Sequence, residues 1–198
     1  MFDDAEILSI DVEKNGLHGI VFAVGAVLLS RDGSVLESFR ARCPVQGEPR
    51  DFVRREVLPA LEAFPITHSS AESLRAEFWH WFVGARKHAH IFADCGWPSE
   101  ARFFIALADD DRETRYLNGP FPLNEIATLL LAVGEDPHTN REEYAREYLG
   151  DRSGQRHHPW WDAYVSGLCA IKAFRAIETK SSLTSPLVTT FNDPNRDA

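Results

Sequence analysis

The chain has 198 residues, of which 44% are hydrophobic, enough to bury the core of one ordinary domain. Its formal net charge of −9 argues against broad adhesion to duplex nucleic acid, because phosphate binding normally rests on lysine and arginine. The N-terminal residues lack the pattern of a secretory signal, and no apolar run approaches the roughly 18 residues that span a bilayer. We therefore expect a cytoplasmic protein that contacts no membrane.

The first part of the chain predicts three strands. Residues 7–12 and 19–29 are rich in Ile, Val, Leu and Phe and are closely bounded by glycine and charged residues. Residues 31–33 (Arg-Asp-Gly) supply a hairpin turn, and residues 34–43 alternate apolar and polar side chains. The third strand should therefore pair antiparallel with the second.

The middle of the chain alternates predicted helices with short strands. Residues 51–61 predict a short helix that is interrupted at Pro59, and residues 70–83 predict a core-packing helix. A buried strand follows over residues 88–94, and a further helix begins at Pro98.

The last part of the chain is mainly helical. Residues 114–119 predict a weak strand, and three helices follow over residues 122–133, 140–149 and 161–178. This order of elements predicts an α/β domain with a mixed sheet over residues 1–180. The composition of residues 181–198 predicts a polar surface tail.

Two carboxylates lie on the first predicted strand. Asp11 and Glu13 are two positions apart, so both side chains point to the same face. In an apolar strand such a pair repels itself and resists desolvation, which a divalent cation compensates. A half-exposed strand, with Ile10 and Val12 facing the core, explains the same alternation without a metal.

A histidine and an aspartate precede the last predicted helix. Asp162 falls near the helix N-terminus, where the helix dipole favours a carboxylate, and His157 lies on the loop before it. A capping aspartate beside two surface histidines, His157 and His158, is the alternative interpretation.

Together, Asp-Val-Glu on the first strand and His-x-x-x-x-Asp before the last helix resemble the first and third motifs of the DEDDh-type 3′→5′ exonucleases, which belong to the RNase H-like superfamily. The resemblance extends from Leu8 to about Ala176. It implies an α/β, RNase H-like fold in which helices flank a five-stranded mixed sheet of order 3-2-1-4-5. It also implies release of nucleoside monophosphates from the 3′ end of single-stranded RNA or DNA.

The resemblance also assigns roles to the motif residues. Asp11, Glu13 and Asp162 would hold two Mg²⁺ or Mn²⁺ ions about 3.5 to 4 Å apart, one activating water and the other stabilising the leaving 3′ oxygen. His157 would be the base, because an imidazole titrates near neutral pH. The motif spacing favours His157 over His158.

The second motif departs from the family pattern, which places an aspartate near the start of the helix after the fourth strand. Here Asp94 has the family's residue type but stands at the strand end, whereas Glu100 has the helical position and one more methylene. Both stay open as metal ligands, with a slight preference for Asp94. Lys14 replaces a small hydroxyl residue, and its charge either contacts substrate phosphate or weakens metal binding.

Other residues suggest contacts with substrate. Trp97 and Trp160 flank the motifs and predict stacking on unpaired bases, with core packing as the alternative role. A cluster of arginines predicts either a basic rim or an exposed helix face: Arg50, Arg54 and Arg55.

Two further alternatives follow from the resemblance to this family. The irregular second motif and Lys14 also fit a catalytically impaired, exonuclease-like module that only binds nucleic acid. Many small members of the family are dimers, so a homodimer is an alternative to a monomer.

Overall fold

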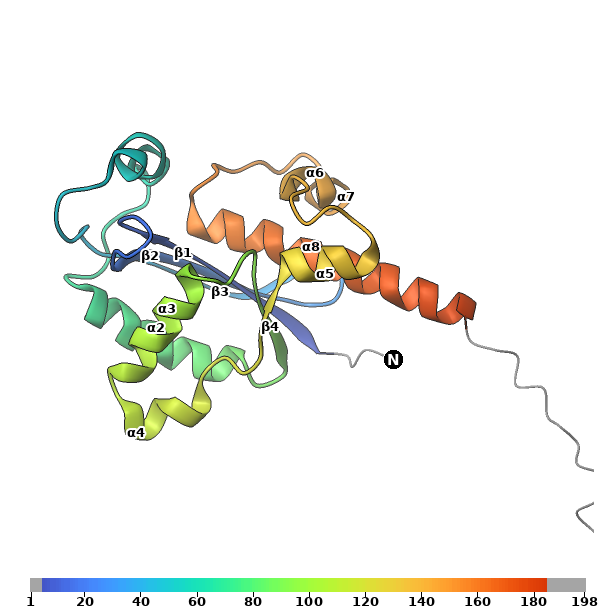
Figure 1. The fold of residues 1–198 in the computed structure, drawn as a ribbon, viewed down its shortest axis with the longest axis horizontal. Coiled ribbons are helices and arrows are strands. Elements are labelled where there is room, and N and C mark those ends of the chain that lie inside the picture. The colour runs from blue at the N-terminus through green and yellow to red at the C-terminus, as the bar shows by residue number, and fades with distance from the viewer. Residues whose placement is uncertain (1–4, 185–198) are drawn as a thin grey trace, which may run out of the picture.

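The computed structural model describes the backbone of residues 5–184 and the side chains of residues 5–180. A five-stranded mixed sheet in the order β3-β2-β1-β4-β5 lies between two layers of helices (Figure 1). β1 pairs antiparallel with β2 and parallel with β4, and β2 pairs antiparallel with β3. The predicted fold class and strand order are confirmed. The strands are β1 (Glu6–Lys14), β2 (Val21–Leu29), β3 (Val35–Arg42), β4 (Ala89–Ala93) and β5 (Leu123–Glu125).

Each face of the sheet packs against its own helices. On one face, α2 (Ala71–Ala85) and α3 (Ser99–Asp109) bury aromatic side chains such as Phe78 and Phe103. On the other face, α5 (Ile126–Val133) and α8 (Pro159–Thr184) form a second core. The sheet is therefore covered on both sides, as its uninterrupted apolar β2 strand requires.

The alternation of β1 decides where its carboxylates lie. Leu8, Ile10 and Val12 belong to the core under α2 and α3, whereas Ile7 belongs to the core under α8. Because successive side chains of a strand point to opposite faces, Asp11 and Glu13 lie on the α8 side.

α8 lies unusually close to the sheet where it begins. Gly25 of β2 is the strand partner of Asp11, and a Cβ on Gly25 would overlap the backbone nitrogen of Trp160. A Cβ on Gly167 would likewise lie 2.7 Å from Leu29 Cδ1. These two glycines let α8 rest on β2 and bring its first turn beside the end of β1.

The chain between α3 and α5 differs from the prediction. Residues 114–118 are helical, in α4 (Arg112–Arg115) and the 3₁₀ turn η2 (Tyr116–Asn118), and the Asp111 side chain caps the Thr114 amide at the start of α4. The fifth strand is β5, which takes the first residues of the stretch predicted as a helix over 122–133. Its three residues are too few for an alternating pattern to identify.

Other elements follow the sequence more closely. The turn at residues 31–33 joins β2 to β3, with Gly33 at a φ of 92°. The predicted helix over 51–61 is a π-helical turn, η1 (Val53–Val57), followed by α1 (Leu58–Ala60). The helix predicted over 140–149 is split into α6 (Arg141–Tyr144) and α7 (Arg146–Leu149).

α8 extends six residues beyond the predicted end at 178, to Thr184, and residues 185–198 of the predicted tail lie outside the described residues. Within residues 5–184, no helix combines the length and apolar character needed to cross a bilayer.

Candidate active site

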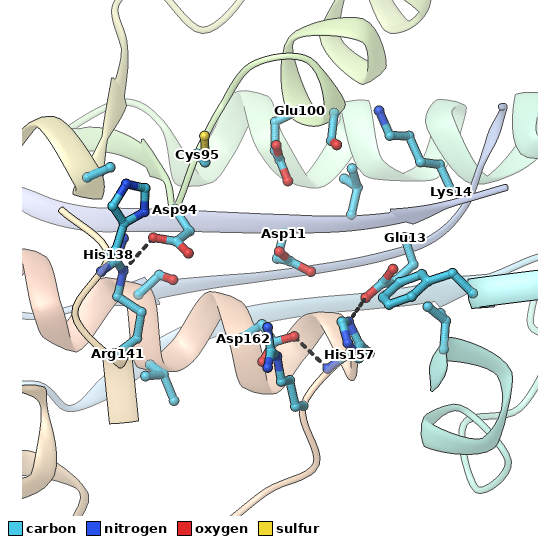
Figure 2. A pocket seen from close by; sticks show the side chains of 18 of the residues that line it. Asp11, Glu13, Lys14, Asp94, Cys95, Glu100, His138, Arg141, His157 and Asp162 are labelled. Carbon is cyan, nitrogen blue, oxygen red and sulfur yellow. Dashed lines mark hydrogen bonds and ion pairs between the residues drawn. The ribbon is translucent and has the colours of Figure 1, made fainter. Parts of the chain in front are cut away.

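A pocket of about 870 Å³ opens at the carboxyl end of β1. Its lining comes from β1, η1, the first turn of α3, the segment before α6, and the start of α8. Most of the residues predicted for the site line this pocket (Figure 2): Asp11, Glu13, Lys14, Asp94, Glu100, His157 and Asp162. Trp97 and Trp160 do not line it.

Asp11 occupies the centre of the acidic group. Burial raises its pKa well above the usual value, and the charges of Glu100, Asp162, Glu13 and Asp94, in that order, raise it further. Four neighbouring carboxylates therefore act on one half-buried carboxyl. Such an arrangement is unfavourable unless the carboxyls take up protons or a cation.

Glu100 projects from the first turn of α3 toward Asp11 (Figure 2). It is only 5% exposed. Burial raises its pKa to about 7, although the backbone amides of Glu100 and Val12 hydrogen-bond its carboxylate and, like the charge of Lys14, oppose the shift. The Val12 amide is free to meet this carboxylate because the pairing of β1 with β4 ends at Ser9.

Asp94 is engaged elsewhere. Its Oδ1 accepts a hydrogen bond of 2.6 Å from Nε of Arg141, in an ion pair at the far end of the pocket. The other nitrogens of the Arg141 guanidinium donate to the carbonyls of Thr139, at 2.6 Å, and Pro137, at 2.8 Å. Asp94 therefore holds the segment before α6 in place, and its charge is already balanced.

His157 and Asp162 are joined by the turn that starts α8. His157 has a left-handed φ of 68°, and its backbone N–H donates to Asp162 Oδ2 at 2.8 Å. The imidazole Nδ1 lies 3.3 Å from Glu13 Oε1, and the Phe52 and His157 rings pack at nearly right angles with centroids 5.3 Å apart. The turn thus aims both His157 and Asp162 at the end of β1.

The pKa values of His157 and Asp162 are both raised, but for different reasons. The hydrogen bond with Glu13 is the main reason that the pKa of His157 is raised, while burial opposes it. Burial raises the pKa of Asp162 to about 6, against the hydrogen bond from the His157 amide.

His158 has a different environment. Its ring stacks on Phe64 with centroids 5.1 Å apart, and burial lowers its pKa. It does not line the pocket.

The centre of the pocket fits a divalent cation. Ligand atoms of Glu13, His157 and Asp162 all lie within 4.8 Å of one another. Asp11 and Glu100 line the same pocket, and hard cations prefer carboxylate oxygens. A bound cation would also restore the ionised form of the carboxyls whose pKa is raised.

The two tryptophans expected at the substrate have other surroundings. The Trp160 ring stacks on Tyr164 with centroids 5.4 Å apart and lies under the guanidinium of Arg40. Trp97 is 68% exposed, next to the end of β5, where its amide donates to Glu125.

Sequence reasoning missed Phe52 and Arg141, which contact His157 and Asp94. Neither belongs to a spacing pattern, because each meets its partner only through the fold.

Helices on both faces of a mixed sheet of order β3-β2-β1-β4-β5 define an RNase H-like fold, and acidic residues gather at the end of its β1 strand. Among solved structures, the chain is similar to one described as the nuclease domain of 3'hExo, a DEDDh family member, bound to rAMP. The TM-score is 0.52 and the identity 13%, over 86% of this chain and 92% of that chain. The chain therefore has the fold of a DEDDh nuclease domain, as the resemblance implied. No family model and no curated protein matches it.

Proposed function

We propose that the chain is a metal-dependent 3′→5′ exonuclease that releases nucleoside monophosphates from single-stranded RNA or DNA. One observation carries the proposal. Four acidic side chains from three separate elements converge with His157 in one open pocket: Asp11, Glu13, Glu100 and Asp162. A purely structural role does not account for so many carboxyls whose burial is unfavourable.

In this proposal Glu100, rather than Asp94, is the acidic residue of the second motif. Glu100 faces Asp11, and its charge acts on Asp11 more strongly than that of any other neighbouring carboxylate. Asp94 instead pairs with Arg141. The longer glutamate side chain makes up for the distance between the first turn of α3 and β1.

The carboxylates would hold two Mg²⁺ or Mn²⁺ ions, which when bound supply Lewis acidity to the scissile phosphate and its leaving oxygen. His157 takes the proton from the attacking water, and its imidazole must be neutral to do so. The Phe52 ring and the hydrogen bond to Asp162 keep the His157 loop over the pocket.

Lys14 is proposed to contact substrate. It lines the pocket, and its Nζ donates to the Leu17 carbonyl at 3.0 Å. Base stacking on Trp97 or Trp160, a homodimer and a cytoplasmic location stay predictions from the sequence.

Release of acid-soluble nucleotides from uniformly labelled single-stranded RNA and DNA tests the activity. Release should require Mg²⁺ or Mn²⁺, stop with EDTA, and be abolished in Asp11→Asn. Asp111→Asn is the matched control, because Asp111 caps α4 outside the pocket and asparagine also caps helices. If neither strand is degraded with either metal, the chain is better described as a nucleic-acid-binding module.

A further inference from the structure

A second hollow of about 690 Å³ lies beside the carboxylate pocket, between residues 15–19 and residues 47–54. Arg50 lines both hollows and so marks the boundary between them. Its side chain lies across Gly16, where a Cβ would be 3.1 Å from Arg50 Cγ. Both volumes fall in the range of about 300 to 1,000 Å³ that is typical of ligand sites.

Asn15 fixes the second hollow to the end of β1. Its Nδ2 donates to the carbonyls of Gln46, at 3.1 Å, and Glu48, at 3.0 Å. Its Oδ1 accepts a hydrogen bond of 2.8 Å from the Arg50 amide. The backbone that carries Arg50 is thus held at a set position relative to the proposed metal ligands.

The three arginines of this region differ in their contacts. Arg54 pairs with Glu48 at 2.6 Å and also donates to the Pro49 carbonyl. Arg55 lines neither hollow. Within the described residues, no hydrogen bond or ion pair engages the guanidinium of Arg50, which is exposed.

An exposed guanidinium with free donors, held between two hollows, is suited to a phosphate, which it can bind through two parallel hydrogen bonds. At the far end of the carboxylate pocket, each of the three guanidinium nitrogens of Arg141 already donates to Asp94 or to a backbone carbonyl, so this group is less available to a ligand. Of the two ends of the pocket, the one at Arg50 is better suited to the backbone of a strand.

We propose that the second hollow binds the single strand on the 5′ side of the bond that is cut, with Arg50 contacting a backbone phosphate there. This inference rests on the proposed function, because it takes the carboxylate pocket as the place of the scissile phosphodiester. It makes Arg50 a substrate-binding residue that acts only on substrates longer than one nucleotide.

Fluorescence anisotropy of a labelled five-nucleotide strand tests the inference, with Ca²⁺ replacing Mg²⁺ and strand integrity checked on a gel. Arg50→Gln should raise the Kd about tenfold, since it removes a charge-assisted hydrogen bond. The slope of log K against log salt should become shallower by about 0.7, the contribution of one phosphate contact to a single strand. In Arg50→Gln, the affinity for a nucleoside monophosphate, measured by competition, should fall much less than the affinity for the strand.

Arg55→Gln is the matched control, because it removes the same charge from the same segment outside both hollows. It should leave the Kd and the salt slope near the wild-type values. An unchanged slope in Arg50→Gln, an equal loss in Arg55→Gln, or an equal loss of monophosphate binding overturns the inference.

The two proposals fail in different ways. If Arg50→Gln weakens strand binding in a protein that hydrolyses no strand, the binding site is supported and the exonuclease proposal is refuted. If hydrolysis is metal-dependent but Arg50→Gln leaves the Kd for the strand unchanged, the exonuclease proposal is supported and the binding site is refuted.

Discussion

Burial makes the ionised carboxyls of the pocket unfavourable in the metal-free protein. The pKa of Glu100 is raised to about 7 and that of Asp162 to about 6, with burial as the main cause for both. The folded state therefore binds more protons than the unfolded chain, in which such groups titrate near 4. The contribution of these two groups to the free energy of unfolding is therefore largest below about pH 4. It is lost as pH rises through their folded pKa values.

The raised pKa of Glu100 predicts that Glu100→Gln stabilises the metal-free protein at pH 8, because a neutral amide then replaces a buried charge. A gain of about 1 kcal/mol should raise the melting temperature by about 2–4 °C in a chain of this size. With saturating Mn²⁺ the variant should instead melt below wild type, since it has lost a ligand. Thermal melts in EDTA and in Mn²⁺ measure both effects.

Asp94→Asn is the informative comparison for that experiment. It should lower the melting temperature with and without metal, because the Asp94 carboxylate already pairs with Arg141. If Glu100→Gln melts below wild type in EDTA while Asp94→Asn melts above it, the roles assigned to the two carboxylates are reversed.

His157 is expected to act as base only in its neutral form. Its pKa is raised mainly by the hydrogen bond with Glu13, so at low pH the protonated imidazole persists. The kcat of wild type should therefore rise with pH until His157 is deprotonated.

His157→Ala should lower kcat by about 10²- to 10⁴-fold and remove that pH dependence. His158→Ala is the control, because His158 packs on Phe64 outside the pocket, and it should keep both kcat and the pH profile. A His157→Ala enzyme with the wild-type profile would assign the proton transfer to another group.

At the scale of elements, the contact of α8 with β2 positions the third motif. Gly25→Ala places a Cβ where it overlaps the Trp160 backbone, so α8 must shift and carry His157 and Asp162 away from β1. We expect a loss of stability of about 1–3 kcal/mol, typical of overpacking, together with weaker Mn²⁺ binding. Urea unfolding and metal titration measure the two effects.

Gly84→Ala provides the control for added volume. Gly84 lies in α2, and within the described part of the chain a Cβ added there has open space around it, so alanine should stabilise the helix by up to about 1 kcal/mol. Unchanged metal affinity in Gly25→Ala would mean that α8 does not need its close approach to place Asp162.

The elements that the sequence predicted well are those with long apolar patterns. β1 and β2 are rich in Ile, Val, Leu and Phe, and α8 repeats apolar residues at helical spacing. β1 and α8 also carry residues of the first and third motifs. β5 has only three residues, and its pairing with β4 depends on contacts made after folding. Sequence reasoning therefore placed the fifth strand too early.

The second motif shows the same limit at the site. Asp94 fits the family by residue type, but its partner Arg141 lies 47 positions later and reaches it only in the fold. Glu100 comes close to Asp11 only because α3 packs against β1, which no local pattern records. The sequence could place both candidates near the pocket but could not tell their contacts apart.

At the scale of the whole molecule, a net charge of −9 is compatible with nucleic acid as substrate, because several basic side chains line the pocket. Lys14, Arg50 and Arg156 line the pocket around its acidic centre. Binding should therefore depend on a divalent cation at the centre and on few phosphate contacts, and should be correspondingly weak on duplexes.

Cleavage direction tests the central claim most directly. Single strands labelled at the 5′ end are incubated with Mn²⁺, with either a free or a chemically blocked 3′ end, and the products are separated on a sequencing gel. We predict a ladder that shortens one nucleotide at a time from the free 3′ end, with nucleoside monophosphates released and blocked strands intact. Immediate release of the labelled 5′ nucleotide, or internal cuts in the blocked strand, would contradict a 3′→5′ exonuclease.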